Sequence, residues 1–147
     1  MYKRILIATD GSPLSRKAVR GGIDLAASLE AAAVIVNVVP RYPASYFEGA
    51  ITYTPEDMGR IEKQWAEQGQ AIAEAARLQA EGRGVAAKAV VVQSDRVGES
   101  LLAAAKKHKC DLIVMASHGR KGISRLLLGS ETQHVLTHGG LPVLVLR

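Results

Sequence analysis

The sequence predicts a doubly wound α/β fold, with a five-stranded parallel sheet in the order 3-2-1-4-5 between two layers of helices. Three observations support this prediction. Short runs rich in valine and isoleucine alternate with longer segments of helical periodicity. These runs lack polar alternation, which is typical of strands buried on both faces of a parallel sheet. The length of 147 residues fits one domain, over residues 1–147.

The apolar runs and the periodic segments define the expected elements. A helix between two fully apolar strands forms a right-handed crossover, so neighbouring strands should be parallel. We expect strands over residues 3–9, 33–39, 85–92, 111–115 and 141–147, and helices over residues 13–29, 55–80, 96–105 and 130–138.

Each helix start carries a sequence signal. Ser12-Pro13 and Thr54-Pro55 place a capping hydroxyl before a proline at the first helical position. We expect Ser94-Asp95 to cap the third helix, and Ser130 with Gln133 to form a capping box at the fourth. The second helix should bury an apolar face, formed by Met58, Ile61, Trp65, Ile72 and Ala76.

Composition and charge favour a cytoplasmic protein that binds neither membranes nor nucleic acid. No apolar run is long enough to span a membrane, and Met1–Arg4 leads into a strand rather than a signal peptide. The net charge of +5 would permit an acidic partner, but the basic residues are dispersed and no nucleic-acid-binding motif accompanies them. Cys110, directly before a strand, is expected to be a buried, unreactive thiol.

The segment from Val114 to Ser130 has the character of a phosphate-binding loop. It begins in an apolar strand, continues as a basic loop with glycines, and ends where a helix starts. Such a loop exposes backbone N–H groups, and the helix adds its positive end. We expect Arg120, Lys121 and Arg125 to line this anion site.

Polar residues follow the first, second and fourth strands, at the edge where ligands bind in doubly wound sheets. In the predicted order the first and fourth strands flank the point where the strand order reverses. Asp10 then faces the phosphate loop, where it could bind ribose hydroxyls or a magnesium ion that bridges phosphates. An ordinary Asp-Gly turn at Asp10-Gly11 remains an equal alternative.

The phosphate loop contains neither a Walker motif nor the Rossmann glycine triplet. Instead, the loop resembles the nucleotide signature of the universal stress protein family. In this sequence the pattern reads Ala116-x-x-Gly119, then nine residues, then Gly129-Ser130. The family commonly has glycine at the positions of Ala116, Gly119 and Gly129. The resemblance extends over the chain and implies a Rossmann-like fold of the adenine nucleotide alpha hydrolase type. It also rests on Asp10-Gly11-Ser12, Asn37-Val38, Ser117–Arg120 and Pro142–Val145.

In ATP-binding members of the family, the position of Asp10 contacts ribose and the backbone at Val38 meets adenine. The resemblance thus implies that ATP or another adenine nucleotide binds here, with magnesium only through the nucleotide. Ala116 departs from the pattern, because the family commonly has glycine there. We expect the methyl group of Ala116 to narrow the site or to disfavour a turn with positive φ. The implied contact residues are Thr9, Asp10, Gly11, Ser12, Asn37, Val38, Met115, Ala116, Ser117, Gly119, Arg120, Gly129, Ser130, Glu131 and Thr132.

The favoured function is a regulatory stress-response protein that binds ATP with little or no hydrolysis, since no general base or arginine finger is evident. The alternatives are a nucleotide-free dimeric interaction module, an adenylyl-transferring enzyme of the ATP-pyrophosphatase type, and a phosphoacceptor domain. We assign no catalytic or metal-binding residue. His118 lacks a nucleophile elbow, and His134 and His138 lack a third ligand.

Two further segments carry expectations about interactions. The last strand, Leu141–Arg147, is apolar, lies at a sheet edge and has no following helix, so we expect a homodimer through it. Residues 40–54 form an irregular stretch with three tyrosines and the only phenylalanine. These aromatic side chains either cover a ligand or pack onto the sheet edge.

Overall fold

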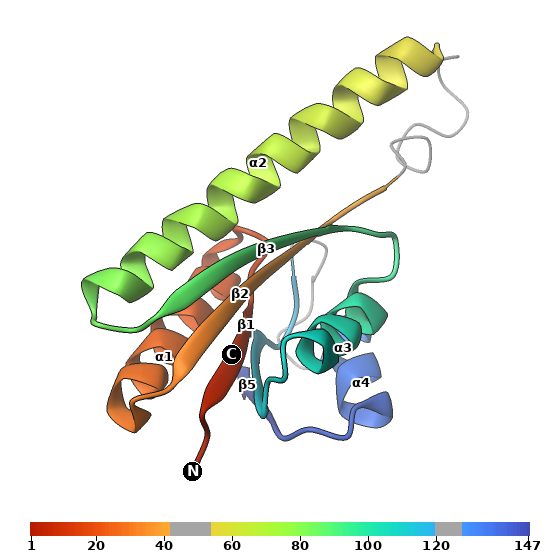
Figure 1. The fold of residues 1–147 in the computed structure, drawn as a ribbon. Helices are drawn as coiled ribbons and strands as arrows, with labels where there is room; N and C mark the ends of the chain where they lie inside the picture. The colour runs from red at the N-terminus through yellow and green to blue at the C-terminus, as the bar shows by residue number, and fades with distance from the viewer. Residues whose placement is uncertain (42–53, 120–127) are drawn as a thin grey trace.

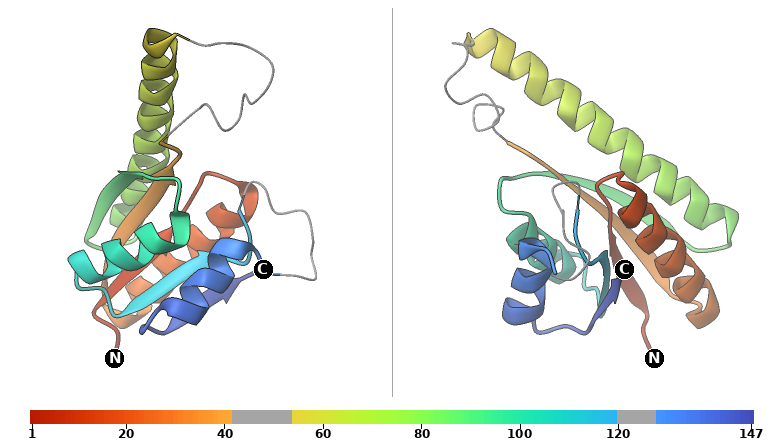
Figure 2. Two further views of the ribbon diagram at one scale, coloured as in Figure 1. Left: turned by 90° about the vertical axis from the view of Figure 1, so that its right-hand side faces the viewer. Right: turned by 180° about the vertical axis from the view of Figure 1, so that it is seen from behind.

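The computed structural model describes residues 1–41, 54–119 and 128–147. Within these ranges it contains a parallel sheet in the order β3-β2-β1-β4-β5, which confirms the predicted topology. Helices α1 and α2 cover one face and α3 and α4 the other (Figure 1, Figure 2). The elements are β1 (Arg4–Ala8), α1 (Pro13–Leu29), β2 (Ala32–Val39), α2 (Pro55–Gly82), β3 (Ala87–Gln93), α3 (Val97–Lys107), β4 (Leu112–Ala116), α4 (Ser130–His138) and β5 (Val143–Leu146).

Two predicted features fall largely outside the described residues. The aromatic stretch lies mostly within residues 42–53, and the basic cluster Arg120, Lys121 and Arg125 lies within residues 120–127. Within the described ranges, no helix combines the length and apolarity needed to cross a membrane.

The core lies on both faces of the sheet. Ile5 and Ile7 of β1 pack with the cluster under α1 and α2, whereas Leu6 packs with Leu101 of α3 and Val135 of α4. All five side chains are at most 2% exposed. Because successive strand residues point to opposite faces, a strand covered on both sides is apolar at nearly every position. The uninterrupted apolar runs in the sequence therefore reflect the three-layer architecture.

Helix α2 approaches the sheet through small residues. A Cβ atom on Gly69 would lie 2.5 Å from Cγ1 of Val39, a distance that no real side chain tolerates. The predicted apolar face is only partly correct, because its larger members are half-buried. Small residues let the helix axis lie close to β2 and β3, so the residues that it buries are Gly69, Ala73, Ala76 and Ala80.

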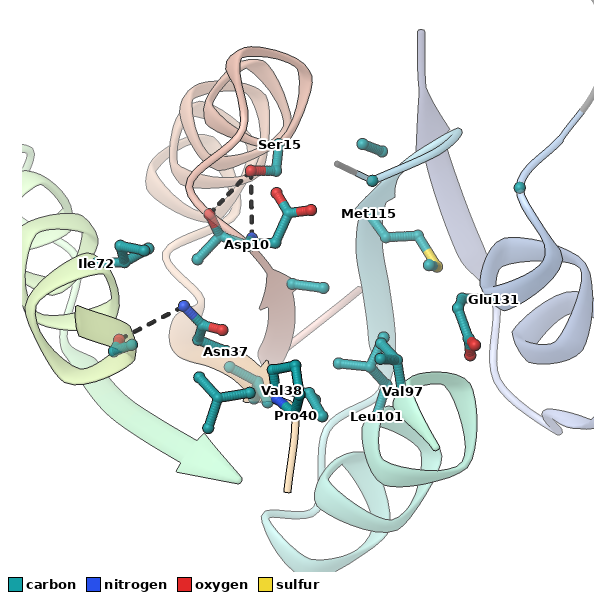
Figure 3. Close-up of a pocket in the computed structure, with 18 of the residues that line it drawn as sticks. Asp10, Ser15, Asn37, Val38, Pro40, Ile72, Val97, Leu101, Met115 and Glu131 are labelled. Atoms are coloured by element: carbon teal, nitrogen blue, oxygen red, sulfur yellow. Dashed lines mark hydrogen bonds between the residues drawn. The ribbon is translucent and has the colours of Figure 1, made fainter. Parts of the chain in front are cut away.

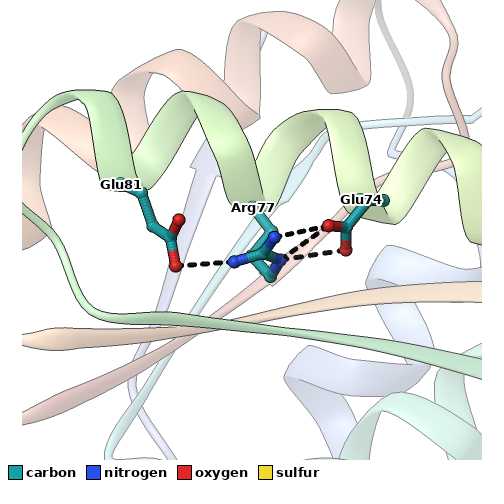
Figure 4. A network of polar contacts seen from close by, with 3 residues as sticks. All are labelled: Glu74, Arg77 and Glu81. Carbon is teal, nitrogen blue, oxygen red and sulfur yellow. Dashed lines mark hydrogen bonds and ion pairs between the residues drawn. The ribbon is translucent and has the colours of Figure 1, made fainter.

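The solvent face of α2 carries a chain of ion pairs (Figure 4). Arg77 lies 2.5 Å from Glu74 and 2.6 Å from Glu81, one turn away on either side. Hydrogen bonding to Arg77 lowers the pKa of the Glu74 carboxyl. Because these groups are solvated, they contribute little to stability, and small-residue packing holds α2 in place.

Two of the predicted helix caps are confirmed. The Ser12 hydroxyl accepts a hydrogen bond from Ser15 N–H at 3.2 Å, and the Thr54 hydroxyl accepts one from Asp57 N–H at 3.1 Å. In both helices the following proline occupies the first turn, where its missing N–H costs nothing.

The other two predicted caps are wrong. Arg96 occupies the N-cap position of α3, which has no side-chain cap, and the Ser94 hydroxyl accepts from Arg96 N–H in the turn before the helix. Helix α4 starts one residue earlier than the capping box requires, with Gly129 at the cap and Ser130 inside the helix. Gln133 donates its side-chain amide to the Leu128 carbonyl instead.

The thiol of Cys110 is 6% exposed, and burial raises its pKa to about 11. At pH 8 the thiolate of the folded protein should be on the order of 100-fold scarcer than that of an unstructured cysteine. We expect Ellman's reagent to modify the folded protein at least about 100-fold more slowly than the guanidinium-unfolded chain. Equal rates in the two states would show that the thiol is accessible.

Candidate functional site

A pocket of about 560 Å³ lies at the carboxyl ends of the strands, above the boundary between β1 and β4. From this boundary β1 leads into α1 on one face and β4 leads toward α4 on the other, which opens a crevice at this edge. The pocket volume falls in the range of small-molecule sites. Its walls come from the turn after β1, the ends of β2 and β4, and parts of α2, α3 and α4 (Figure 3).

The part of the pocket toward α3 is apolar. Leu101 and Met115, both predominantly buried, form its base, and Val97 closes it from the start of α3. This compartment can cover a flat, apolar ring system. Its side chains are Ala8, Val36, Val38, Val97, Leu101 and Met115, all of which belong to or pack against the core on the α3 face.

The backbone of Val38 faces the crevice. The Val36 carbonyl accepts from Thr9 N–H on the β1 side, and the Val39 carbonyl accepts from Ser94 N–H on the β3 side. Because strand carbonyls alternate in direction, Val38 points to the same side as Val36. Pairing with β1 ends at Ala8 and Val36, so Val38 N–H and C=O lie beyond the ladder. They offer an adjacent donor and acceptor at the rim of the apolar compartment.

Asp10 is both a turn residue and part of the pocket wall. One carboxylate oxygen accepts from Ser12 N–H at 2.9 Å, and Gly11 adopts a positive φ of 79°. The other oxygen would lie 2.7 Å from a Cβ atom on Gly119, so the turn after β1 and the loop after β4 meet across the crevice. Gly11 and Ser12 shape this turn but do not line the pocket.

Two buried hydroxyls fix the same turn. Thr9 and Ser15 have their oxygens 3.1 Å apart, and the Ser15 hydroxyl donates to the Ser12 carbonyl at 3.0 Å. Asp10 N–H donates to Ser15 at 3.3 Å. The position of the Asp10 carboxylate is therefore set before any ligand arrives. Sequence reasoning identified Thr9 but missed Ser15, which appeared only as one more residue of a helix.

The loop after β4 is closed at its base by α4. The Ser117 carbonyl accepts from Gly129 N–H at 2.7 Å, and the Thr132 hydroxyl lies 3.0 and 3.1 Å from the Ala116 and Ser117 carbonyls. Ser117 and Thr132 are 5% and 1% exposed. Ser117 lies outside the pocket wall, whereas Thr132 lines it. Their hydrogen bonds place the start of α4 beside the end of β4.

The start of α4 is a source of free backbone donors. Gly129 N–H is already bonded to Ser117, and Gln133 is the first residue whose N–H bonds back along the helix, to the Gly129 carbonyl at 3.0 Å. Ser130, Glu131 and Thr132 lie between them, so their N–H groups have no intrahelical acceptor. All three residues line the pocket, where the helix dipole favours an anion.

Ala116 is compatible with the geometry of the site. It is the last residue of β4, pairs with Leu146, and is 7% exposed. Its side chain belongs to the core cluster on the α1 face, away from the apolar compartment. The described non-glycine residues with positive φ are Glu30 and Lys109, so Ala116 needs no glycine-like conformation. The methyl group fits the strand without strain.

The α2 wall was not predicted as part of the site. Trp65, Gln68 and Ile72 line the pocket from this side, and Asn37 donates its side-chain amide to the Gly69 carbonyl at 3.5 Å. Asn37 was predicted from its place at the end of β2. The α2 residues carried a helical pattern, but the pattern does not reveal which turn of a helix faces the end of the sheet.

His118 also lines the pocket, and its Nδ1 lies 3.1 Å from the Ser117 hydroxyl, so it orders the turn after β4. Among the described residues, no three His, Cys, Asp or Glu side chains are placed to share a metal ion. His134 and His138 stack on the surface of α4 with ring centroids 4.2 Å apart. Arg120, the remaining predicted contact, lies outside the described ranges.

Comparisons with known proteins agree with this architecture. Residues 1–147 match the model of the universal stress protein family. Universal stress protein MJ0531 of Methanocaldococcus jannaschii is 32% identical over 147 residues, which are 100% of this chain and 83% of the relative.

Solved structures of universal stress proteins share the fold. UspA from Lactobacillus plantarum aligns with a TM-score of 0.83 at 20% identity, over 99% of this chain and 98% of that one. A universal stress protein solved in complex with cAMP aligns with a TM-score of 0.65 at 25% identity, over 98% and 95% of the two chains. The chain therefore belongs to the universal stress protein family.

Proposed function

We propose that this protein binds an adenine nucleotide, ATP included, in the pocket at the carboxyl ends of the strands, and acts as a regulatory protein in the stress response. One observation carries the proposal. Asp10 shares one pocket with two complementary features, the free amides at the start of α4 and the apolar compartment with the Val38 backbone at its rim. An adenine nucleotide has a ribose, phosphates and a flat base, which need contacts of these three kinds.

In this binding mode the adenine ring lies between the side chains of the apolar compartment. Val38 C=O accepts from the exocyclic amine, and Val38 N–H donates to a ring nitrogen. Asp10 accepts hydrogen bonds from the ribose hydroxyls, and the phosphates meet the amides of Ser130, Glu131 and Thr132 next to Gly119. Magnesium would be held only through the phosphates. The complex of a related protein with cAMP supports an adenine ligand.

We propose that hydrolysis is slow or absent. The sequence has no lysine at a P-loop position and no evident general base to activate water. In the proposed mode the Asp10 carboxylate is engaged by ribose, which leaves it unable to activate water. Rapid, stoichiometric turnover of ATP by the pure protein would contradict this part of the proposal.

The proposal is tested by identifying any small molecule that co-purifies with the protein and by measuring the effect of added nucleotide on thermal stability. Denaturation followed by mass spectrometry should release an adenine nucleotide, and added nucleotide should raise the melting temperature of stripped protein through linkage. The absence of any nucleotide, together with no thermal shift on adding Mg-ATP or AMP, would favour the alternative of a nucleotide-free interaction module.

We also propose that the protein forms a homodimer through β5. The Pro142 carbonyl accepts from Ile113 N–H and the Leu146 carbonyl from Ser117 N–H, so the alternate residues Val143 and Val145 direct their backbone groups away from β4. In the described sheet β5 is an edge strand. An apolar edge of this kind pairs readily with a second copy.

Replacing Val145 with proline is expected to dissociate the dimer without unfolding the protein. Proline removes an N–H that faces outward, and edge strands tolerate this loss. Val145→Thr keeps both the N–H and the β-branched shape, so it should remain dimeric. Light scattering at micromolar concentration distinguishes the two variants. A monomeric parent protein, or a dimeric Val145→Pro variant, would contradict dimerisation through this edge.

A further inference from the structure

Glu131 places a negative charge at the start of α4. It is the second residue of the helix, its side chain is half-buried, and it lines the pocket. One carboxylate oxygen accepts from Gly98 N–H of α3 at 2.5 Å. Figure 3 shows the side chain at the side of the pocket, between α4 and α3. Glu131 thus bonds to a free amide of α3 while its own amide faces the pocket.

The hydrogen bond to Gly98 does not require a charge. A Cβ atom on residue 98 would lie 3.0 Å from the same carboxylate oxygen, so the two helices meet closely here and Gly98 cannot supply a side chain of its own. The carbonyl oxygen of a glutamine has the same reach and accepts the same bond. The negative charge is therefore separable from the packing of α3 against α4.

The charge acts on whatever binds at the α4 amides. A phosphate held by the N–H groups of Ser130, Glu131 and Thr132 would share the pocket with the Glu131 carboxylate, and like charges in one half-buried pocket repel. Asp95 also lines the pocket. The repulsion that the Glu131 carboxylate adds grows with each additional phosphate charge on the ligand.

We infer that Glu131 is a specificity-determining residue that shifts the preference of the site toward adenine nucleotides of low phosphate charge, such as nucleoside monophosphates, and away from uncomplexed ATP. This inference rests on the proposed function, since it concerns the phosphate end of the same site. The α4 amides attract any phosphate group, whereas Glu131 distinguishes nucleotides by the number of charges on their phosphates.

The test compares Glu131→Gln with Glu99→Gln. The first removes the pocket charge and keeps an acceptor for Gly98. The second removes the same charge from an exposed residue of α3 that pairs with Arg96 at 3.3 Å, outside the pocket wall. Adenosine, AMP and ATP are titrated into each nucleotide-stripped protein by calorimetry, with EDTA present so that no metal neutralises the phosphates.

We expect the Glu131→Gln variant to bind ATP about 10-fold and AMP about 3-fold more tightly than the parent protein, with the affinity for adenosine unchanged, because the repulsion grows with ligand charge. Glu99→Gln should leave all three affinities within about 2-fold, since exposed charges are screened. Unaltered thermal unfolding of Glu131→Gln would show that the bond to Gly98 persists.

The outcomes separate the two proposals. The inference is supported if the Glu131→Gln variant binds ATP and the parent protein does not, or if the variant has a higher ratio of ATP affinity to adenosine affinity than the parent. An unchanged ratio, or weaker ATP binding by the variant, overturns the inference and leaves the nucleotide site standing. Failure of both proteins to bind adenosine, AMP and ATP would refute the proposed function and this inference with it.

Discussion

Replacing Gly119 with valine is expected to weaken adenine-nucleotide binding by about 100-fold while the protein stays folded. A Cβ atom at this position would lie 2.7 Å from the Asp10 carboxylate, so the side chain must displace Asp10 or enter the pocket. Either movement removes the ribose acceptor or narrows the path to the α4 amides. A conflict of this kind costs about 3 kcal/mol, which corresponds to roughly 100-fold in affinity.

Gly140→Val serves as the matched control for this variant. A Cβ atom on Gly140 would meet nothing within 4 Å, and Gly140 does not line the pocket. Calorimetric titration with AMP should show binding to the parent and to Gly140→Val, and little heat with Gly119→Val. Parent-like affinity of Gly119→Val would show that the ligand does not bind beside Asp10 and Gly119.

A valine at position 69 is expected to destabilise the fold by about 3 kcal/mol, near the upper end of the range for overpacked sites. The new Cβ atom would lie 2.5 Å from Cγ1 of Val39, and α2 must move away from β2 to relieve the overlap. That movement also withdraws the Gly69 carbonyl from Asn37, so one wall of the pocket shifts with the helix.

The same substitution at position 59 of α2 separates crowding from helix propensity. A Cβ atom on Gly59 would meet nothing within 4 Å, and a β-branched residue is a better helix former than glycine. Urea unfolding should show Gly59→Val to be neutral or slightly more stable, and Gly69→Val to be much less stable. Equal free energies of unfolding for the two variants would refute the close approach of α2 to β2.

The fold could be predicted because buried parallel strands leave a strong pattern in sequence. Strands covered on both faces are mostly apolar, so β1, β2 and β4 appear as apolar runs, broken only by Arg4 at the start of β1 and by Asn37 near the end of β2. The caps at Ser12 and Thr54 were found because a hydroxyl followed by proline has few other interpretations. The capping box at Ser130 failed because Gly129, held by the Ser117 carbonyl, already begins the helix.

The site residues at the ends of strands and helices could be located from the sequence, whereas those that depend on contacts between elements could not. Asp10, Val38, Gly119 and Ser130 stand directly at strand or helix ends, which the topology brings to one edge. Contacts between elements leave no such local signal. The α2 wall depends on how far a helix slides along the sheet, and the bond from Glu131 to Gly98 depends on how two helices meet, so both emerged only in three dimensions.

The central claim is that an adenine nucleotide binds between Val38 and the start of α4. The most direct test follows the backbone amide resonances of the isotopically labelled protein during titration with AMP. We expect the largest shifts at the amides of Val38, Ser130, Glu131 and Thr132, with saturation at one nucleotide per chain. Shifts confined to other parts of the molecule, such as the opposite end of the strands around Lys106–Lys109, would contradict the claim.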